Sequence, residues 1–343
     1  MVSGGPQGRD VRLSSLPGPH LTVQASELSD QTTPAQTGRI RPPVRRPAGS
    51  DHAWADQQTY SPPPVCATHY VALTAVTPSL SGDPLAVLGA GELDCVCHGE
   101  AIKAVPQTLP PPVSLITLTG TGIRQIERDD FLPYALHLRD IVLSKNAHLQ
   151  RIRAHALRRL PHLLNIYVQH APSLESVSPR AWYDLPALRS LDLDGNRIKS
   201  LPSNSINITT DQLSLANSQL ESISDWAFNG SRIGTLQLNG NLHLKRLDRL
   251  AFRGLGSLRT LDLSDTALLS LPTVGLEDIE RLLVKRTPSL MTFPSVYHFG
   301  SIEEAHLTYP YHCCAFDFPA IQDPDQHRKY QVGDTETAVW ADS

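Results

Sequence analysis

The sequence predicts an α/β-type solenoid of about nine stacked repeats, curved like a horseshoe, with a parallel sheet on its concave face and a disordered N-terminal extension. A short apolar motif recurs along 113–309 at nearly even intervals. The segment 1–64 shows no such repeat and is rich in Pro, Gly, Ser, Thr and Gln. A short unit of this kind cannot bury its own apolar side, so successive units must stack.

The motif consists of an apolar residue, two others, an apolar residue, any residue and a third apolar residue. Its clearest copies are LRSLDLDGN from Leu188 and LRTLDLSDT from Leu258. A period of roughly 20–29 residues with this pattern is typical of leucine-rich repeats, so we expect a leucine-rich-repeat solenoid. The copies start at Val113, Leu138, Leu163, Leu188, Thr210, Ile233, Leu258, Ile279 and Ile302.

Each copy predicts one short strand whose apolar residues point into the solenoid, because side chains alternate between the two faces of a strand. The third, fifth and seventh residues of each copy then face the solvent on the concave side. Asn146, Asn196 and Asn241 recur at the ninth position, where an asparagine side chain can hydrogen-bond the backbone of a turn. A second apolar row is expected to pack the convex side as core: Phe131, Leu157, Trp182, Phe228 and Phe252.

Outside the repeats, residues 1–90 are expected to be disordered, because their composition buries too little apolar surface to offset the entropy of ordering. Residues 91–112 are expected to form an N-terminal cysteine cap. We recognise no signal peptide, so one expectation is that this chain begins at an alternative start site. We also find no apolar run long enough to span a membrane. A net charge of −4 argues mildly against nucleic acid as the partner.

Two stretches resemble the glycoprotein hormone receptors, the family of the follitropin, lutropin and thyrotropin receptors. They are the repeats from DWAFNGSRIGTLQLNGN (225–241) onward and YPYHCCAF (309–316), of which the second is the more specific. The resemblance covers about residues 95–316. It implies an extracellular horseshoe that binds a cystine-knot heterodimeric hormone on its concave face, followed by a hinge that opens at YPYHCCAF and a seven-helix domain that couples to a G protein. A thyrostimulin-like heterodimer is the expected partner if the source is an invertebrate.

The cysteines near the N-terminal end depart from the family pattern. CVCHGEAIKAVP (95–106) is similar to the family's cysteine cap, but the cysteine that follows it in the family is missing. One arrangement that fits pairs Cys66 with Cys95 and leaves Cys97 free, and the pairing of the three stays open. At the other end, residues 310–343 are expected to be the start of the hinge and a divergent tail, so the chain is expected to be truncated before the membrane domain.

Cys313 and Cys314 stand side by side in YPYHCCAF. Neighbouring Cα atoms lie ~3.8 Å apart, below the ~4.4 Å at which disulfides usually begin, so these two cysteines are not expected to bond to each other. In the family they bond to cysteines farther along the hinge, which this chain lacks, so we expect free thiols or mispairing. A metal site that adds His306 and His312 does not have a zinc-like spacing, and we expect no metal and no cofactor.

Binding is expected on the concave strands, where acidic residues make the middle negative and Arg281 and Lys285 make a basic spot near the C-terminal end. Tyr167 and Leu283 are the expected apolar anchors, since such anchors carry much of the energy of an interface. The candidate hormone-binding residues are Asp140, Tyr167, Asp192, Asp194, Gln237, Asp262, Arg281, Leu283 and Lys285. Glycosylation sequons begin at Asn207 (NIT) and Asn229 (NGS).

An enzyme is not expected, because the sequence has no HExxH, GxSxG or P-loop motif. Two other classes of function remain open. One is a secreted leucine-rich-repeat adhesion, matrix or decoy binding protein, which would not be expected to carry the receptor-type YPYHCCAF. The other is an intracellular leucine-rich scaffold, which the missing signal peptide favours. As a receptor, the region is expected at the extracellular face of the plasma membrane, or secreted as this shorter chain.

Overall fold

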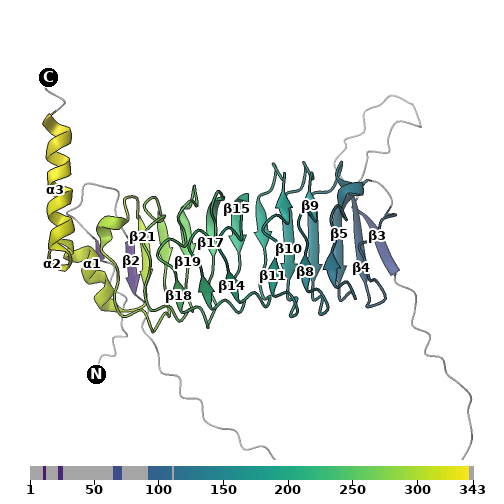
Figure 1. Ribbon diagram of the computed structural model, residues 1–343, viewed down its shortest axis with the longest axis horizontal. Coiled ribbons are helices and arrows are strands. Elements are labelled where there is room, and N and C mark those ends of the chain that lie inside the picture. The colour runs from purple at the N-terminus through teal and green to yellow at the C-terminus, as the bar shows by residue number, and fades with distance from the viewer. Residues whose placement is uncertain (1–10, 13–21, 26–64, 72–91, 110–111, 340–343) are drawn as a thin grey trace, which may run out of the picture.

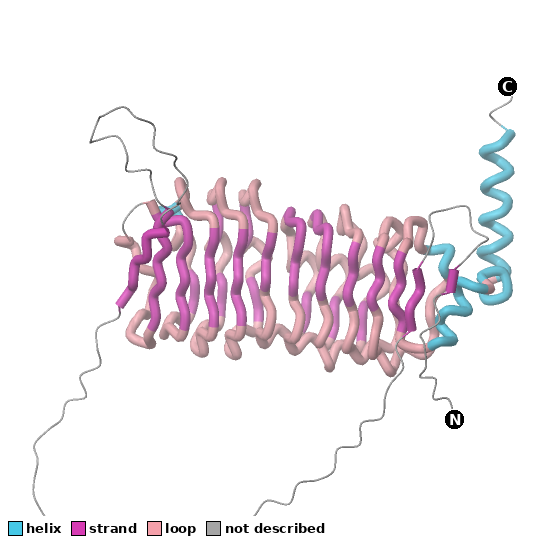
Figure 2. The backbone as a smooth tube through the Cα atoms, turned by 180° about the vertical axis from the view of Figure 1, so that it is seen from behind, coloured by secondary structure: helices cyan, strands magenta, loops and turns pink. Residues whose placement is uncertain are grey.

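The computed structural model describes residues 92–109 and 112–339, together with the short segments 11–12, 22–25 and 65–71. These residues form an elongated solenoid in which one long sheet runs from end to end (Figures 1 and 2). The leucine-rich-repeat solenoid predicted from the period of the apolar motif is confirmed.

The long sheet contains 13 strands among the described residues. Strands of successive repeats pair in parallel, so that Ile166 lies opposite Ile141 on one side and Leu191 on the other. In spatial order the strands are β1 (Val11–Arg12), β2 (Thr22–Ala25), β21 (Glu304–Leu307), β20 (Arg281–Leu283), β19 (Thr260–Asp262), β17 (Arg232–Gln237), β15 (Thr209–Ser214), β13 (Ser190–Asp192), β10 (Asn165–Gln169), β7 (Asp140–Ser144), β5 (Val113–Thr119), β4 (Glu92–His98) and β3 (Val65–Val71).

The alternation of side chains along each strand agrees with the predicted register. Leu191 and Leu193 are completely buried, whereas Ser190, Asp192 and Asp194 between and beside them are half-buried on the solvent side. A shift by one residue would exchange the two sets. The inner side of the long sheet therefore forms one wall of a continuous apolar core.

The opposite side of each repeat, which we call the outer side, is built from turns and two-residue strands instead of α-helices. Parallel strands lie ~4.8 Å apart, whereas packed helices lie ~8–10 Å apart, so strand pairing on the outer side limits the curvature of the stack. The outer strands form three small sheets: β6 (Gln125–Ile126), β8 (Arg151–Ile152) and β11 (Ser176–Val177); β9 (Leu157–Arg158) and β12 (Trp182–Tyr183); and β14 (Ser200–Leu201), β16 (Ser222–Ile223) and β18 (Arg246–Leu247).

The second apolar row fills the space behind the long sheet, as predicted. Phe131, Leu157, Phe228 and Phe252 are completely buried, and Trp182 is nearly so. The rings of Phe228 and Phe252 stack with their centroids 6.1 Å apart. This row is therefore core, and it ties the outer turns to the long sheet.

Buried asparagines join consecutive repeats at the turn that follows each long strand. The Asn196 side-chain oxygen accepts the backbone N–H of Ala171 at 3.0 Å, and its Nδ2 donates to the carbonyls of Val168 at 2.6 Å and Leu193 at 2.7 Å. Asn146 and Asn241 make the corresponding contacts in their own repeats. Each of these side chains satisfies turn backbone that the core hides from water.

The N-terminal cap contains a strand that the repeat pattern did not predict. β3 pairs antiparallel with β4, which places Cys66 directly opposite Cys97, and the two form a disulfide with their Cα atoms 4.0 Å apart. The suggested pairing of Cys66 with Cys95 is therefore wrong, because Cys95 lies opposite Thr68 and stays a buried free thiol. β3 lies within the segment 1–90, for which disorder was expected.

The C-terminal end of the solenoid carries the helices. η3 (Pro310–Cys313) and α1 (Cys314–Asp317) follow β21, and α2 (Pro319–Gln322) and α3 (Pro324–Val339) stand beyond the last repeat (Figure 1). Shorter 3-10 turns occur at η1 (Leu132–Tyr134) and η2 (Val296–His298). At the same end, β2 from the N-terminal region pairs in parallel with β21, and β1 pairs antiparallel with β2. Among the described helices, none has the length and apolar character that a membrane span requires.

The disulfide assignment can be tested by mass spectrometry of the chain denatured and alkylated without reduction. We expect Cys95, Cys313 and Cys314 to be alkylated, and Cys66 and Cys97 to appear as one cross-linked pair of peptides that reduction separates. Alkylated Cys97 together with a Cys66–Cys95 cross-link would contradict the register of β3 against β4.

The asparagine contacts predict a large loss of stability on substitution. In Asn196→Ala, the buried N–H of Ala171 and carbonyl of Val168 lose their partner, and each such group costs about 1–3 kcal/mol. We expect the free energy of unfolding, measured by urea denaturation, to fall by about 2–4 kcal/mol. The matched control is Asn239→Ala, because the half-buried Asn239 side chain makes no hydrogen bond to a described residue; its effect should stay within about 0.5 kcal/mol. Equal losses would contradict the role of the turn.

Candidate functional site

The strand face is the solvent side of the long sheet, formed by the outward residues of the strands from β4 to β21. All nine candidate hormone-binding residues lie on it or at its edge: Asp140 on β7, Tyr167 on β10, Asp192 on β13, Gln237 on β17, Asp262 on β19, Arg281 and Leu283 on β20, and Asp194 and Lys285 two residues beyond β13 and β20. Arg281 is exposed and the other eight are half-buried. The strand face thus brings together residues that are far apart in the sequence.

The sheet register divides these residues into two groups. Tyr167 lies directly opposite Asp192, which places an aromatic ring beside a carboxylate in the first group. In the second group Asp262 lies between Gln237 and Leu283 on adjacent strands. Asp192 and Asp262 are three strands apart, or ~14 Å at the usual spacing, so one partner protein could contact both groups.

Asp192 and Asp194 are held in place by their neighbours. Asp192 accepts the backbone N–H of Asp194 at 2.8 Å and the amide of Gln169 at 2.5 Å. Asp194 accepts the backbone N–H of Ala216 at 2.8 Å and the hydroxyl of Ser214. Burial raises the pKa of Asp194, and the charge of Asp192 raises it further against the opposing hydrogen bonds. The site therefore contains one carboxylate whose negative charge a basic partner would stabilise.

The other carboxylates are also aligned with the sheet. Asp140 accepts a hydrogen bond of 2.6 Å from the side-chain amide of Asn165, and Asp262 accepts the backbone N–H of Ser264 at 2.9 Å. Because these contacts restrict the side chains before any partner arrives, less conformational entropy is lost on binding.

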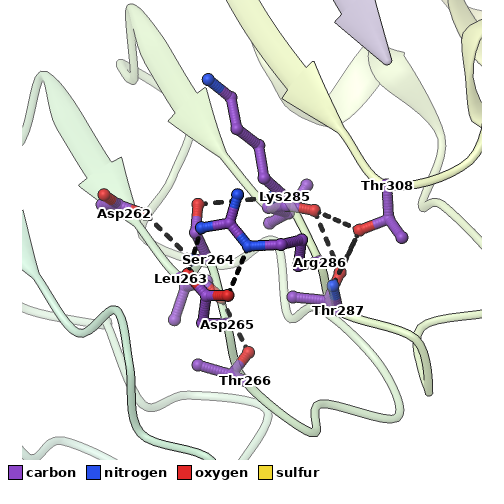
Figure 3. Close-up of polar contacts among 10 residues, drawn as sticks. Asp262, Leu263, Ser264, Asp265, Thr266, Lys285, Arg286, Thr287 and Thr308 are labelled. Carbon is purple, nitrogen blue, oxygen red and sulfur yellow. Dashed lines mark hydrogen bonds and ion pairs between the residues drawn. The ribbon is translucent and has the colours of Figure 1, made fainter. Parts of the chain in front are cut away.

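The predicted basic spot is largely neutralised. Arg281 forms an ion pair with Glu304 (3.4 Å between Nε and Oε2), and Glu304 also contacts His306 at 2.6 Å. Lys285, in contrast, has no ion pair with a described residue, and its side chain extends away from the Arg286–Asp265 pair (Figure 3). In the same view Arg286 binds Asp265 with two contacts of 2.5 Å. Lys285 is therefore the basic side chain of this end that remains available.

Two acidic residues of the strand face were missing from the candidate set. Glu304 on β21 neutralises Arg281 from the next strand. Asp94 lies on β4 of the cap, half-buried, with Leu115 as its partner on β5. The alternation in ELDCVCH, where Leu93, Cys95 and Cys97 are buried, is the sequence signal that could have identified this strand.

The asparagine side chains of the two sequons differ in their exposure to solvent. Asn207 is exposed in the turn that precedes β15. Asn229 is half-buried, and its Nδ2 donates to the side-chain oxygen of Asn204 at 2.9 Å. Of the two, Asn207 is the side chain with more room for a glycan.

The hinge-like segment contains an aromatic cluster. His312 is 2% exposed, and its ring centroid lies 4.8 Å from that of Tyr311 and 6.0 Å from that of Phe293. Burial lowers the pKa of His312 and raises that of the neighbouring Cys313 thiol. Cys313 and Cys314 are both free thiols. Within the described residues, no group of three or more His, Cys, Asp or Glu side chains is arranged to hold a metal ion.

These features define a leucine-rich-repeat protein with a long, mostly acidic strand face. The chain matches the family model described as Leucine rich repeat at residues 136–198 and 209–268. Among solved structures, the TLR13–ssRNA13 complex aligns with a TM-score of 0.41 and 17% identity, over 59% of this chain and 38% of that chain.

Curated relatives give a narrower assignment. The chain is 30% identical over 286 residues to the thyrotropin receptor of Mus musculus, which covers 72% of this chain and 36% of the receptor. It is 40% identical over 126 residues to the lutropin-choriogonadotropic hormone receptor of Homo sapiens, which covers 36% of this chain and 18% of the receptor. The chain thus spans about a third of the thyrotropin receptor it matches. It is homologous to the thyrotropin and lutropin receptors over the ectodomain region and fits a glycoprotein hormone receptor ectodomain.

The depressed pKa of His312 predicts acid sensitivity. A buried neutral histidine that ionises on unfolding contributes stability that is fully present above the unfolded pKa of about 6.5 and is lost as pH falls below it toward the folded pKa. We expect the free energy of unfolding to fall by up to about 1.4 kcal/mol per pH unit in that window from this group.

His312→Phe keeps an aromatic ring in the cluster and removes the titration, so it should flatten this part of the profile. His162→Phe, at an exposed position, is the matched control and should leave the slope as it is. Urea titrations between pH 7.5 and 5.0 measure both variants. An unchanged slope in His312→Phe would show that His312 does not ionise on unfolding.

Proposed function

We propose that this chain is the hormone-binding ectodomain region of a glycoprotein-hormone-type receptor and that its strand face binds a cystine-knot heterodimeric protein hormone. The observation that carries the proposal is the homology to two receptors of this kind along the repeats that build the strand face. In such a receptor the solenoid stands outside the cell, ahead of a seven-helix domain that couples to a G protein. A thyrostimulin-like heterodimer remains the specific partner we propose.

The charges of the strand face indicate what kind of surface the partner presents. Asp94, Asp140, Asp192, Asp194 and Asp262 line the face from the cap to β19, and the hydrogen bonds that they accept come from uncharged amide, hydroxyl and backbone groups. A complementary partner therefore presents basic residues toward the middle of the sheet. Its field would steer the encounter and raise the association rate.

Apolar contact supplies the second part of the binding energy. The half-buried ring of Tyr167 lies beside Asp192, where it can pack against a partner side chain whose charge meets the carboxylate. Leu283 occupies the corresponding place beside Asp262. Rigid anchors that are already half-buried lose little entropy on binding, and such residues are typical hot spots.

In the secretory route, which this proposal requires, the exposed Asn207 of the NIT sequon can be glycosylated. The sequon lies away from the strand face, before β15, so a glycan there leaves the proposed binding surface open.

Charge reversal on the strand face tests the proposal. We expect Asp192→Lys combined with Asp262→Lys to lower the association rate of a recombinant cystine-knot heterodimer at least tenfold at low salt, because attraction is replaced by repulsion across the interface. Raising the ionic strength should shrink the difference, since exposed charges are screened within ~8–10 Å. Surface plasmon resonance of the full chain at two salt concentrations measures both effects.

Glu221→Lys combined with Asp278→Lys is the matched control, because it makes the same change in charge at exposed positions outside the strand face. Thermal unfolding checks that all variants are folded. If the hormone binds and both double variants associate equally fast, the acidic strand face is only solvated surface and the proposed interface is wrong.

A further inference from the structure

The paired strands of the outer side are interrupted between β11 and β14. The sheet of β6, β8 and β11 ends at β11, and the sheet of β14, β16 and β18 begins at β14 (Figure 1). The edge of β11 and the edge of β14 that face each other therefore have no partner strand. The long sheet is continuous at this level, because β10 pairs with β13. Among the described residues, no hydrogen bond joins 176–186 to 200–209.

A change of repeat length explains the interruption. The motif copies that start at Val113, Leu138, Leu163 and Leu188 are evenly spaced, whereas the copy at Thr210 follows Leu188 after a shorter interval. The longer repeat on the N-terminal side forms a second outer strand, β12, and the shorter one forms no strand between β14 and β15. Since the two outer segments do not match, their backbones do not pair, and a cleft is left between them.

Two cavities lie along this cleft, of about 700 and 1020 Å³, and both are lined by residues from its two walls. An extended residue in a sheet occupies roughly 160 Å³, from its rise and from the spacings between strands and between sheets. The smaller cavity alone therefore has room for about four residues of an extended chain.

Two residues of the larger cavity lining contain a buried polar atom without a hydrogen-bond partner among the described residues. Trp182 is 3% exposed, lines the larger cavity, and its indole N–H has no hydrogen-bond partner among the described residues. The buried Nδ1 of His155, from the same cavity lining, is also without a partner there. Both atoms are closed off from the open cavity, so they are unsatisfied polar groups within the cleft wall and not contact points for an occupant.

The charge of the cleft lining is positive, because Arg128, Arg151, Arg153 and Arg180 stand against Glu127 and Asp184. Arg151 lines the first cavity and Arg180 the second, and neither forms an ion pair with a described residue. Arg153 and Arg128 are already neutralised by Glu127 and Asp129. The two available guanidinium groups favour an occupant that carries a carboxylate.

We infer that the cleft between β11 and β14 is a second binding site, which takes an extended acidic peptide segment of a partner protein as an added strand. The backbone of the segment would pair with the open edges of β11 and β14 and join the two outer sheets into one. Its carboxylate lies at Arg151 or Arg180. The site lies on the opposite side of the solenoid from the strand face and does not depend on the proposed hormone.

The test uses a phage-displayed library of random heptapeptides selected on the full chain, followed by fluorescence polarisation of the enriched peptides. We expect alternating β-branched residues with at least one Asp or Glu. Arg180→Glu should weaken their binding at least tenfold. Arg249→Glu should weaken it less than twofold, because Arg249 is an exposed arginine outside the cleft, near the buried Ala251–Phe252 pair of a later repeat.

Hydrogen exchange locates the bound peptide. The proposal requires slower exchange of the amides at 176–178 and 200–203 when the peptide is present. It is overturned if no peptide is enriched over a bare surface, if both arginine variants bind equally well, or if the protected amides lie elsewhere. Asn207 lines the larger cavity, so the proposal is also overturned if the peptide binds only to Asn207→Gln, because a glycan would then be the occupant. A second copy of the chain would be the occupant if light scattering showed that the wild-type chain self-associates and that Arg180→Glu does not.

Discussion

The structure depends on the hydrogen bonds that buried turn side chains make to the backbone of the preceding repeat. A repeat of this length hides its turn backbone behind the next repeat, where water cannot reach it. Asn196 supplies one acceptor and two donors at that position, and Thr308 acts similarly near the C-terminal end, where it accepts from the backbone of Thr287 and donates to Val284. Because these contacts have fixed lengths, they set the distance and register between neighbouring repeats, and the alignment of both the core and the strand face follows.

The repeat architecture could be predicted because two periods agree. The alternation within each motif fixes which side chains are buried, and the spacing of the motifs fixes which residues become neighbours across strands. Leu191 and Asp192 illustrate the first, and Tyr167 opposite Asp192 the second. The cysteine pairing could not be predicted in this way, because β3 lies outside the repeats and its antiparallel register decides that Cys97, and not Cys95, faces Cys66.

The candidate site was predictable in position but not in electrostatics. Which residues face the solvent follows from alternation alone. Whether a charge is available depends on the side chains of the next strand: Glu304 neutralises Arg281, whereas Lys285 has no such neighbour among the described residues. The raised pKa of Asp194 likewise arises from burial against β15, which the single-strand pattern does not contain. The shortened repeat after Leu188 was visible in the sequence, but its consequence depends on how two outer segments fail to match.

The cleft on the outer side leaves two neighbouring repeats with fewer connections. The repeats of β6, β8 and β11, and those of β14, β16 and β18, are joined along both the long sheet and the outer strands. Between β10 and β13 the long sheet and turn contacts such as those of Asn196 join the repeats without an outer strand pair. The long sheet is therefore the main connection between these two groups of repeats. Tyr167 and Asp192 lie opposite each other on the two strands of that connection, so a partner that changed the angle between β10 and β13 would also change how these two side chains are presented. Occupation of the cleft and occupation of the strand face would then alter each other's affinity by the same factor.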